Sequence, residues 1–312
     1  MKFYSSLDDI SIEQKYSAIT VGMFDGVHKG HLAVLDKLVE ISRREQIPSI
    51  VLTFSNHPSS YFKPGSNELQ LCSLEEKKEK LRAIGIDILI AIPFNEDIAK
   101  LTANQFADNI LIRLLKVKYI VFGYDNHFGY KREGSKEFID LHYPTINSIH
   151  VEETIDNGEI ISSSLIKTYL VNGEVEKVSN LLNYGYKLKG KVIKGDQLGR
   201  TIGFPTANID SESAKLIPKL GVYFTRSKIE GKEYYGMTNL GFRPTVSNNK
   251  ELRIETNLFN FNFDIYDEIL EIEFISRMRD EMKFDSLPAL VNQLTKDQKN
   301  AEDLLAQIHV AS

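Results

Sequence analysis

The first half of the chain alternates short apolar runs with longer segments of helical spacing. The apolar runs predict buried strands at 18–21, 49–54, 86–92, 119–122 and 148–151. Apolar residues three or four positions apart predict helices that begin near Leu32 and that cover 74–84, 103–115 and 165–171. We expect the charged residues of the helix 74–84 to form a solvated face. Strands that alternate with helices are typical of a doubly wound parallel sheet, so we predict an α/β domain over residues 1–183.

The second half of the chain, residues 184–312, has a different rhythm. Its apolar runs predict strands at 187–194, 222–229, 234–240, 252–259 and 269–275, separated by turns such as Glu230-Gly231. One amphipathic segment, 287–307, predicts a terminal helix. A series of strands closed by one helix indicates an antiparallel β-barrel with a helix packed on it.

The segment from Gly22 to His31, GMFDGVHKGH, joins the first predicted strand to the first helix. In a parallel sheet, ligands bind at the carboxyl ends of the strands, and a helix N-terminus suits phosphate. His28 and His31 are three positions apart, so they share a face of the helix start and can donate hydrogen bonds to a nucleotide. The alternative is two polar residues that cap a helix. No GxxxxGK[ST] and no GxGxxG occurs here, which excludes a P-loop and disfavours a dinucleotide-binding fold.

Three more polar loops follow predicted strands, at 55–58, 123–134 and 161–167. His57 lies in the first, and the serines in the third can cap a helix and bind phosphate. Ordinary turn chemistry is the alternative for each loop taken alone. Because the carboxyl ends of parallel strands meet at one edge, we expect these loops to gather beside the segment 22–31.

The densest motif of the second half is GDQLGRTIGFPTAN, residues 195–208. Its glycines allow a loop to fold over a ligand, and the oxygens of Thr206 and Asn208 suit Mg²⁺ that is held mostly by phosphate and water. Glu255 lies in a predicted strand and can act as the base for an attacking hydroxyl. The alternatives are a glycine-rich hairpin loop and a strand glutamate that faces solvent.

Composition narrows the classes of function. The chain has 312 residues, 42% hydrophobic and 26% charged, with a net charge of −5, so no general attraction to nucleic acid is expected. The single cysteine, Cys72, indicates a reducing compartment, and we expect a cytoplasmic protein. No apolar run is long enough to span a membrane, and the N-terminus predicts no signal peptide.

The motifs resemble those of a known family. GMFDGVHKGH resembles the HxGH signature of nucleotidylyltransferases and, in its longer form, the adenylyltransferase module of bifunctional bacterial riboflavin kinase/FAD synthetases. The other three loops resemble that module's TFxPHP, GxDFxFGxxRxG and ISSTxIR, with departures at Asn56, Asn126, Ser164 and Lys167. The segment 195–208 resembles the flavokinase motif GxxxGRxxGFPTAN, and the segments around Asn239 and Glu255 follow in the family's order.

The resemblance assigns roles to individual residues. In the first half it implies His28 and His31 as catalytic residues, with ATP and its phosphates bound by Gly22, Phe24, Asp25, Gly30, His57, Ser162, Ser163, Ser164 and Lys167, and flavin bound by Asp125, Phe128 and Arg132. In the second half it implies Glu255 and Asn208 as catalytic residues, Thr206 and Asn208 as Mg²⁺ ligands, Gly195, Gly199, Arg200 and Gly203 as ATP-binding, and Phe204 and Arg279 as flavin-binding.

The resemblance implies a bifunctional enzyme of FAD biosynthesis. With ATP and Mg²⁺ it would phosphorylate riboflavin to FMN, and with a second ATP it would adenylylate FMN to FAD and release pyrophosphate. The alternatives are a riboflavin kinase whose adenylyltransferase domain is weak or inactive, a nucleotidylyltransferase for another phosphorylated small molecule, and a flavin-binding regulatory or storage protein. The sequence has no helix-turn-helix and no basic patch, so it does not favour a transcriptional regulator.

Overall fold

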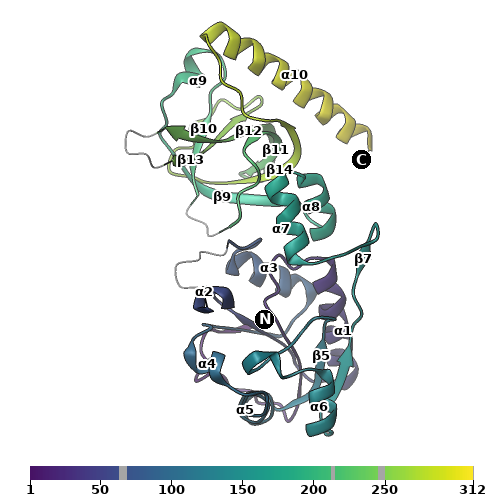
Figure 1. The fold of residues 1–312 in the computed structure, drawn as a ribbon. Helices are drawn as coiled ribbons and strands as arrows, with labels where there is room; N and C mark the ends of the chain where they lie inside the picture. The colour runs from purple at the N-terminus through teal and green to yellow at the C-terminus, as the bar shows by residue number, and fades with distance from the viewer. Residues whose placement is uncertain (63–68, 212–214, 245–249, 312) are drawn as a thin grey trace. The chain divides into compact units, whose positions relative to one another are not determined.

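A computed structural model describes residues 1–62, 69–211, 215–244 and 250–311 (Figure 1). By its internal contacts the chain divides into two compact units, Met1–Ser163 and Ser164–Ser312. The division falls at the start of α7 (Ser163–Asn172). The sequence predicts the domain boundary at 183/184, after α8 (Val175–Leu182). By contacts, however, α7 and α8 both belong with the second unit.

The first unit is built on a six-stranded sheet in the order β1-β4-β3-β2-β5-β6. Every neighbouring pair in it is parallel, which confirms the predicted doubly wound sheet. The strands are β1 (Lys2–Tyr4), β2 (Ser17–Val21), β3 (Ser49–Phe54), β4 (Ile88–Ile92), β5 (Val117–Phe122) and β6 (Asn147–His150). The sequence did not predict β1, because three residues are too few to show an alternating pattern.

Helices cover both faces of this sheet. They are α1 (Lys29–Glu45), α2 (Pro58–Phe62), α3 (Leu74–Ile84), α4 (Glu96–Lys100), α5 (Ala103–Phe106) with a π-helical continuation over Ala107–Leu114, and α6 (Lys136–His142). A short hairpin, β7 (Ile155–Asp156) and β8 (Glu159–Ile160), precedes α7. Successive residues of β2 point to opposite faces: Ala18 packs with Leu35 and Leu38 of α1, and Ile19 packs with Phe106 and Leu111.

The second unit contains a closed barrel in the order β10-β13-β12-β11-β14-β9. Its strands are β9 (Tyr186–Ile193), β10 (Ala207–Asp210), β11 (Gly221–Ile229), β12 (Lys232–Pro244), β13 (Lys250–Leu258) and β14 (Ile269–Arg279), and each is antiparallel to its neighbours. The predicted antiparallel barrel is therefore confirmed. The strand β10 was not predicted, because it begins inside the motif that we interpreted as a loop.

Helices pack on the outside of the barrel. The terminal helix α10 (Leu287–Ala311) lies along β12 and β14, and α8 lies against β14 and β9 (Figure 1). Ala301 of α10 is buried with Val222, Phe224 and Met237 of the barrel wall. The inside of the barrel holds a chain of buried hydroxyls, in which Thr238 lies 2.8 Å from Thr225 and 2.9 Å from Thr256. Met237, Asn239 and Glu255 alternate with these threonines along β12 and β13, so they face the outer side of the barrel, where the larger cavity described below lies.

Candidate active sites

The turn between β2 and α1 is held in an unusual backbone shape. Phe24 has a φ of 48° and Val27 a φ of 43°, a left-handed conformation that is rare for a β-branched residue. The buried Asp25 fixes this shape: its Oδ1 accepts the backbone N–H of Leu71 at 2.7 Å, and its backbone oxygen accepts the Ser163 hydroxyl at 2.9 Å. The predicted phosphate-binding role of Asp25 is thus accompanied by a structural one.

The two histidines lie together at the start of α1. His28 is the N-cap residue, and its Nδ1 accepts the backbone N–H of His31 at 3.3 Å. The two rings stack with their centroids 3.6 Å apart. A Cβ on Gly30 would lie 3.2 Å from the His28 ring and 3.3 Å from the Ile161 carbonyl oxygen, so glycine keeps this corner open. The histidines share a face as predicted, and the helix-capping alternative is also correct for His28.

Both imidazoles are neutral at pH 7. Burial lowers the pKa of His28 to about 4, and its side chain is among the buried polar groups. Burial also lowers the pKa of His31 well below its ordinary value, and repulsion of the protonated ring by a protonated His28 and by Lys77 lowers this pKa further. Because Nδ1 of His28 accepts a hydrogen bond, its one proton is on Nε2. Among the described residues, the buried Nδ1 of His31 has no hydrogen-bond partner. Each neutral ring therefore carries one N–H, which in His28 is on Nε2.

The lowered pKa of His28 predicts a pH-dependent stability of the first unit. The unfolded chain binds the proton of this imidazole near pH 6.5 and the folded chain near pH 4, so stability is complete above pH 6.5 and falls as the pH falls toward 4. We expect protonation of His28 to lower the free energy of unfolding of the first unit by about 2 kcal/mol when the pH falls from 7 to 4.5. His28→Asn keeps a cap acceptor without the titration. Hydrogen exchange of α1 amides at both pH values compares the two proteins, and an equal loss of protection in both would contradict the assignment.

The predicted gathering of polar loops is present at the carboxyl edge of the sheet. The Thr53 hydroxyl, at the end of β3, donates to the Met23 carbonyl at 3.1 Å. The Asn126 amide, from the loop after β5, donates to the Val21 carbonyl at the end of β2. The Ser163 hydroxyl reaches the Asp25 carbonyl, as described above. Segments that lie far apart in the sequence thus surround the turn that carries the histidines.

Two of the residues that depart from the family motifs, Asn56 and Asn126, form hydrogen bonds with other loops and strands. The Asn56 amide exchanges two hydrogen bonds with the backbone of Phe94, at 3.1 and 2.7 Å, and so joins the loops after β3 and β4. Asn126 ties its loop to β2. Beside Asn56, Nδ1 of His57 accepts the backbone N–H of Ser59 at 3.2 Å, at the start of α2. These asparagines therefore add links between loops at the same edge of the sheet.

In the loop 123–134, one of the three predicted flavin-binding residues does not lie where the prediction requires. Phe128 does not offer its ring to a ligand: it is 6% exposed and packs among Phe106, Phe122 and Phe138 in the core. The aromatic residue was interpreted as a binding residue because the sequence alone does not show which side of the loop faces the core. Asp125 and Arg132 are exposed, and the Arg132 guanidinium donates to the Asp125 carbonyl at 2.8 Å.

The remaining predicted phosphate residues divide between the units. Gly22 and Phe24 lie in the turn after β2, where a Cβ on Gly22 would be 3.2 Å from the Phe24 ring. Ser162 lies at the end of the first unit, half-buried. Ser164 and Lys167 lie on α7, in residues that belong by contacts to the second unit. Their role toward ATP stays a prediction.

The sequence interpretation missed Lys77. We expected the charges of α3 to be solvated, but the Lys77 side chain is buried, with the residue 2% exposed. Its ammonium donates to the Met23 carbonyl at 2.6 Å and to the Thr53 hydroxyl at 3.4 Å. One feature of the sequence could have indicated that Lys77 is buried. It lies four residues before Leu81, which is fully buried, and therefore on the same face of the helix.

In the second unit, three polar side chains meet across neighbouring strands. Asn208 of β10 and Asn239 of β12 are each the register partner of Glu255 on β13. Directly opposite residues have Cβ atoms about 5 Å apart and share a face of the sheet. All three side chains line one cavity. Asn239 was part of a quoted motif but was not predicted as a site residue.

The glycine-rich loop closes over these side chains. A Cβ on Gly195 would lie 2.2 Å from the Asn208 amide nitrogen, so only glycine permits this approach. The loop continues into α9 (Leu198–Thr201) and returns through Gly203, whose φ is 86°. The Phe204 N–H then donates to the Gly199 carbonyl at 2.8 Å. The segment is therefore a folded cover on the cavity, as predicted, rather than a simple hairpin loop.

Glu255 faces the cavity rather than open solvent. Its Oε1 accepts a hydrogen bond from Arg253 at 3.2 Å, and the same guanidinium binds Asp196 of the glycine-rich loop at 2.6 Å. The Glu255 side chain is 25% exposed. Arg253, which the sequence interpretation missed, thus links the candidate base to the loop.

The cavity has the size and surface of a ligand site. Its volume is about 330 Å³, within the range of small-molecule pockets. Its lining includes apolar side chains, among them Phe204, Met282 and Phe284, and Leu290 and Leu294 of α10. The polar side chains of Glu255, Asn208 and Asn239 line it as well. This arrangement suits a flat aromatic ligand that carries a polar chain.

Arg279 lines the same cavity, as the flavin prediction requires, but its guanidinium is already engaged. Its Nε and Nη2 bind the carboxylate of Asp297 on α10, at distances from 2.7 to 3.0 Å. Asp297 is 2% exposed. The pair joins β14 to α10 beside the cavity, so Arg279 shapes the site through Asp297 in this structure.

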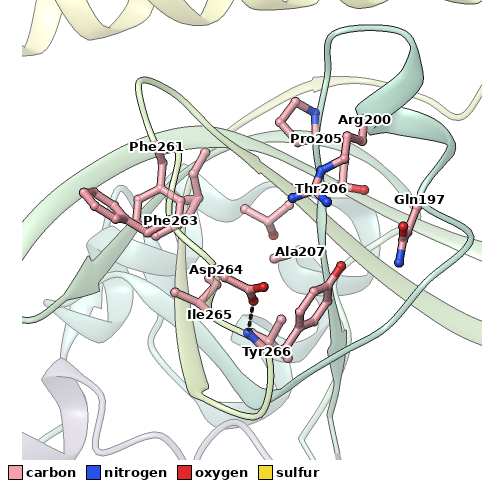
Figure 2. Close-up of a pocket in the computed structure, with 13 residues that line it drawn as sticks. Gln197, Arg200, Pro205, Thr206, Ala207, Phe261, Phe263, Asp264, Ile265 and Tyr266 are labelled. Carbon is pink, nitrogen blue, oxygen red and sulfur yellow. Dashed lines mark hydrogen bonds between the residues drawn. The ribbon is translucent and has the colours of Figure 1, made fainter.

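A smaller cavity of about 90 Å³ lies on the other side of Thr206 (Figure 2). Figure 2 shows Phe261 and Phe263 on one side, and Gln197 and Arg200 on the other. Thr206 and Gln197 line both cavities. The predicted ATP residue Arg200 lines this smaller cavity, and Gly199 lines the larger one. Thr206 thus lines two cavities, one with both apolar and polar side chains and one flanked by aromatic rings and an arginine.

Comparison with known proteins agrees with both halves. The family model described as FAD synthetase matches residues 10–165, and the one described as riboflavin kinase matches residues 182–305. A bifunctional riboflavin kinase/FMN adenylyltransferase of Listeria monocytogenes is 35% identical over 93% of this chain and 93% of its own length. One of the same description from Bacillus subtilis is 36% identical over 94% of this chain and 93% of its own length.

One solved structure has a different description. It is described as a macrolide-efflux protein from Streptococcus pneumoniae, and it matches with a TM-score of 0.90 and 31% identity over 96% of this chain and 98% of that one. In the part of this chain that the structure describes, no helix is long and apolar enough to cross a bilayer. The two family models, the full-length relatives and the paired sites agree with one another, and the chain belongs to the family of bifunctional riboflavin kinase/FMN adenylyltransferases.

Proposed function

We propose that the two units of this chain carry out the two steps of FAD synthesis, each with its own ATP. The barrel phosphorylates riboflavin to FMN, and the parallel-sheet unit adenylylates FMN to FAD with release of pyrophosphate. The single observation that carries this division is that each unit has its own set of convergent polar groups. The histidines lie in the first unit, and Glu255 with Asn208 lies in the second.

In the barrel, Glu255 is the catalytic base. Its carboxylate accepts the proton of the ribityl 5′-hydroxyl as that oxygen attacks the γ-phosphorus of ATP, and ADP leaves. The apolar side chains around Phe204 bind the flavin rings, and Arg279 orients the site through Asp297. The smaller cavity holds part of ATP, with Phe261 and Arg200 in its lining. Thr206, between the two cavities, lies where the phosphates must pass.

The residues at this point fit a magnesium ion. The Thr206 hydroxyl and the Asn208 amide oxygen are hard oxygen donors, and both side chains line the larger cavity. Among the described residues, no group of three or more His, Cys, Asp or Glu side chains is arranged to hold a metal. A metal held mainly by substrate phosphates and water needs no such group. When bound, Mg²⁺ neutralises the charge of the phosphates.

In the first unit, the neutral imidazoles of His28 and His31 donate hydrogen bonds to the α-phosphate of ATP. They stabilise the charge that develops as a phosphate oxygen of FMN attacks the α-phosphorus and pyrophosphate leaves. The N-terminus of α1 adds backbone N–H groups and a partial positive charge. No covalent intermediate with the protein is required, because both reactants are bound at one edge of the sheet.

The geometry favours this function over the alternatives. A kinase with an inactive first unit would not need stacked, neutral histidines at a helix N-terminus. A flavin-storage protein would not need a carboxylate opposite Asn208 on the wall of the flavin cavity. We place the enzyme in the cytoplasm, which the single free cysteine, buried at Cys72, supports.

Product analysis tests the proposal directly. The purified chain is incubated with riboflavin, ATP and MgCl₂, and the flavins are separated by chromatography. We expect FMN to appear first and FAD to follow. Formation of FMN without FAD, even from supplied FMN, would leave only the kinase. Unchanged riboflavin would contradict both activities and favour a binding protein.

A further inference from the structure

Lys77 lies at the site of the first unit without a role in the steps above. It is on α3, which begins at the N-cap Ser73, and its side chain is buried against the turn that follows β2. A buried ammonium is costly unless it is paired or donates hydrogen bonds. The next residue, Lys78, is different: it pairs with Glu75 on the same helix at 2.7 Å and lies over the ring of Phe3.

Residues of the segment 71–77 form hydrogen bonds with two parts of the turn that follows β2. The backbone N–H groups of Leu71 and Cys72 donate to Oδ1 of Asp25, at 2.7 and 3.4 Å. The Gly26 N–H donates to the Cys72 sulfur at 3.1 Å. On the other side, the Lys77 ammonium donates to the Met23 carbonyl at 2.6 Å.

The Met23 carbonyl accepts hydrogen bonds from both Lys77 and a residue of β3. It accepts hydrogen bonds from the Lys77 ammonium at 2.6 Å and from the Thr53 hydroxyl at 3.1 Å. Met23 directly precedes Phe24, whose φ of 48° turns the chain toward the helix start. The Phe24 ring in turn lies 5.1 Å from the His31 ring. Movement of this carbonyl would therefore reach the His31 side chain through one residue.

The charge of Lys77 also reaches the histidines. It lowers the pKa of His31, after burial and after the effect of His28. Burial lowers the pKa of Lys77 itself, and the neighbouring Cys72 and Asp25 oppose that shift. A cation at this depth is screened little by solvent, so it also favours a polyphosphate bound at the edge of the sheet.

We infer that Lys77 is a positioning residue for FMN adenylylation: its ammonium fixes the turn through Met23 and adds a buried positive charge beside the bound triphosphate. The inference rests on the proposed function of the first unit. It predicts that removal of the ammonium affects the adenylylation step and leaves the kinase step of the barrel unchanged.

The test measures both activities of the full chain. Lys77→Met is expected to lower kcat for FMN adenylylation at least about ten-fold, and to move the acid limb of its pH profile to higher pH, because His31 then binds a proton more readily. Riboflavin phosphorylation should stay at the wild-type rate. Lys78→Met, the matched control, should change neither activity. Lys77→Arg keeps the charge and should keep the acid limb of the wild-type protein.

The outcomes separate the inference from the proposed function. If the wild-type chain makes no FAD from supplied FMN, the proposed function fails. If it does, and Lys77→Met has the wild-type kcat and acid limb, only the inference is overturned. Should Lys77→Met not fold, as shown by hydrogen exchange of α1, Lys77→Gln replaces it. A displaced acid limb with Gln and an unmoved one with Arg supports the inference, and an unmoved limb in both overturns it.

Discussion

Glu255→Gln is expected to lower the kinase rate by about 10²- to 10⁴-fold, the usual contribution of a general base. The amide keeps the size of the side chain and its place opposite Asn208, but it does not accept the proton of the attacking hydroxyl. Riboflavin phosphorylation and FAD formation from supplied FMN are measured on the same preparation. We expect the second activity to be unchanged, because it belongs to the other unit.

A second strand glutamate provides the control for this variant. Glu271 on β14 pairs with Lys187 at 2.7 Å and lines neither cavity. Glu271→Gln should therefore leave both activities at the wild-type level. A Glu255→Gln protein that phosphorylates riboflavin at the wild-type rate would show that another group removes the proton.

His31→Ala is expected to have the opposite effect. It removes one hydrogen-bond donor from the phosphate site, which costs about 10²- to 10³-fold in kcat for FAD formation. It also leaves the His28 ring without its stacking partner. Riboflavin phosphorylation should remain at the wild-type rate, and the measurement follows FMN and FAD separately over time.

His142→Ala is the matched control in the same unit. His142 lies exposed on α6 and contacts the ring of Phe138, so its removal should change neither activity. Loss of both activities in His31→Ala would argue against separate sites. An unchanged rate of FAD formation would show that His31 takes no part in the adenylyl transfer.

Much of the fold could be predicted from the sequence, because long apolar periods report burial directly. The parallel sheet and the barrel were both predicted from such periods, and both are present in the structure. The strand β1 and the strand β10 are short, and β10 begins within a glycine-rich motif whose composition indicates a loop. Local pattern alone does not identify such strands, because their place is fixed by their partners β4 and β13.

The candidate sites could be predicted in part for a similar reason. His28, His31 and Glu255 stand in dense motifs, and the structure brings each beside a partner named in advance. Phe128 was misassigned because an aromatic ring in a loop packs equally well on a ligand or on the core. Lys77 was missed because a lysine in a charged helix is usually solvated, and its burial depends on the turn that packs over it.

The fate of labelled ATP tests most directly whether one chain cleaves ATP at two different phosphorus atoms. The wild-type chain is incubated with riboflavin, Mg²⁺ and ATP labelled either at the α- or at the γ-phosphorus. We expect the γ-label in FMN, in FAD and in pyrophosphate, and the α-label in FAD but not in FMN. FMN without the γ-label, or FAD without the α-label, would contradict the two separate transfers.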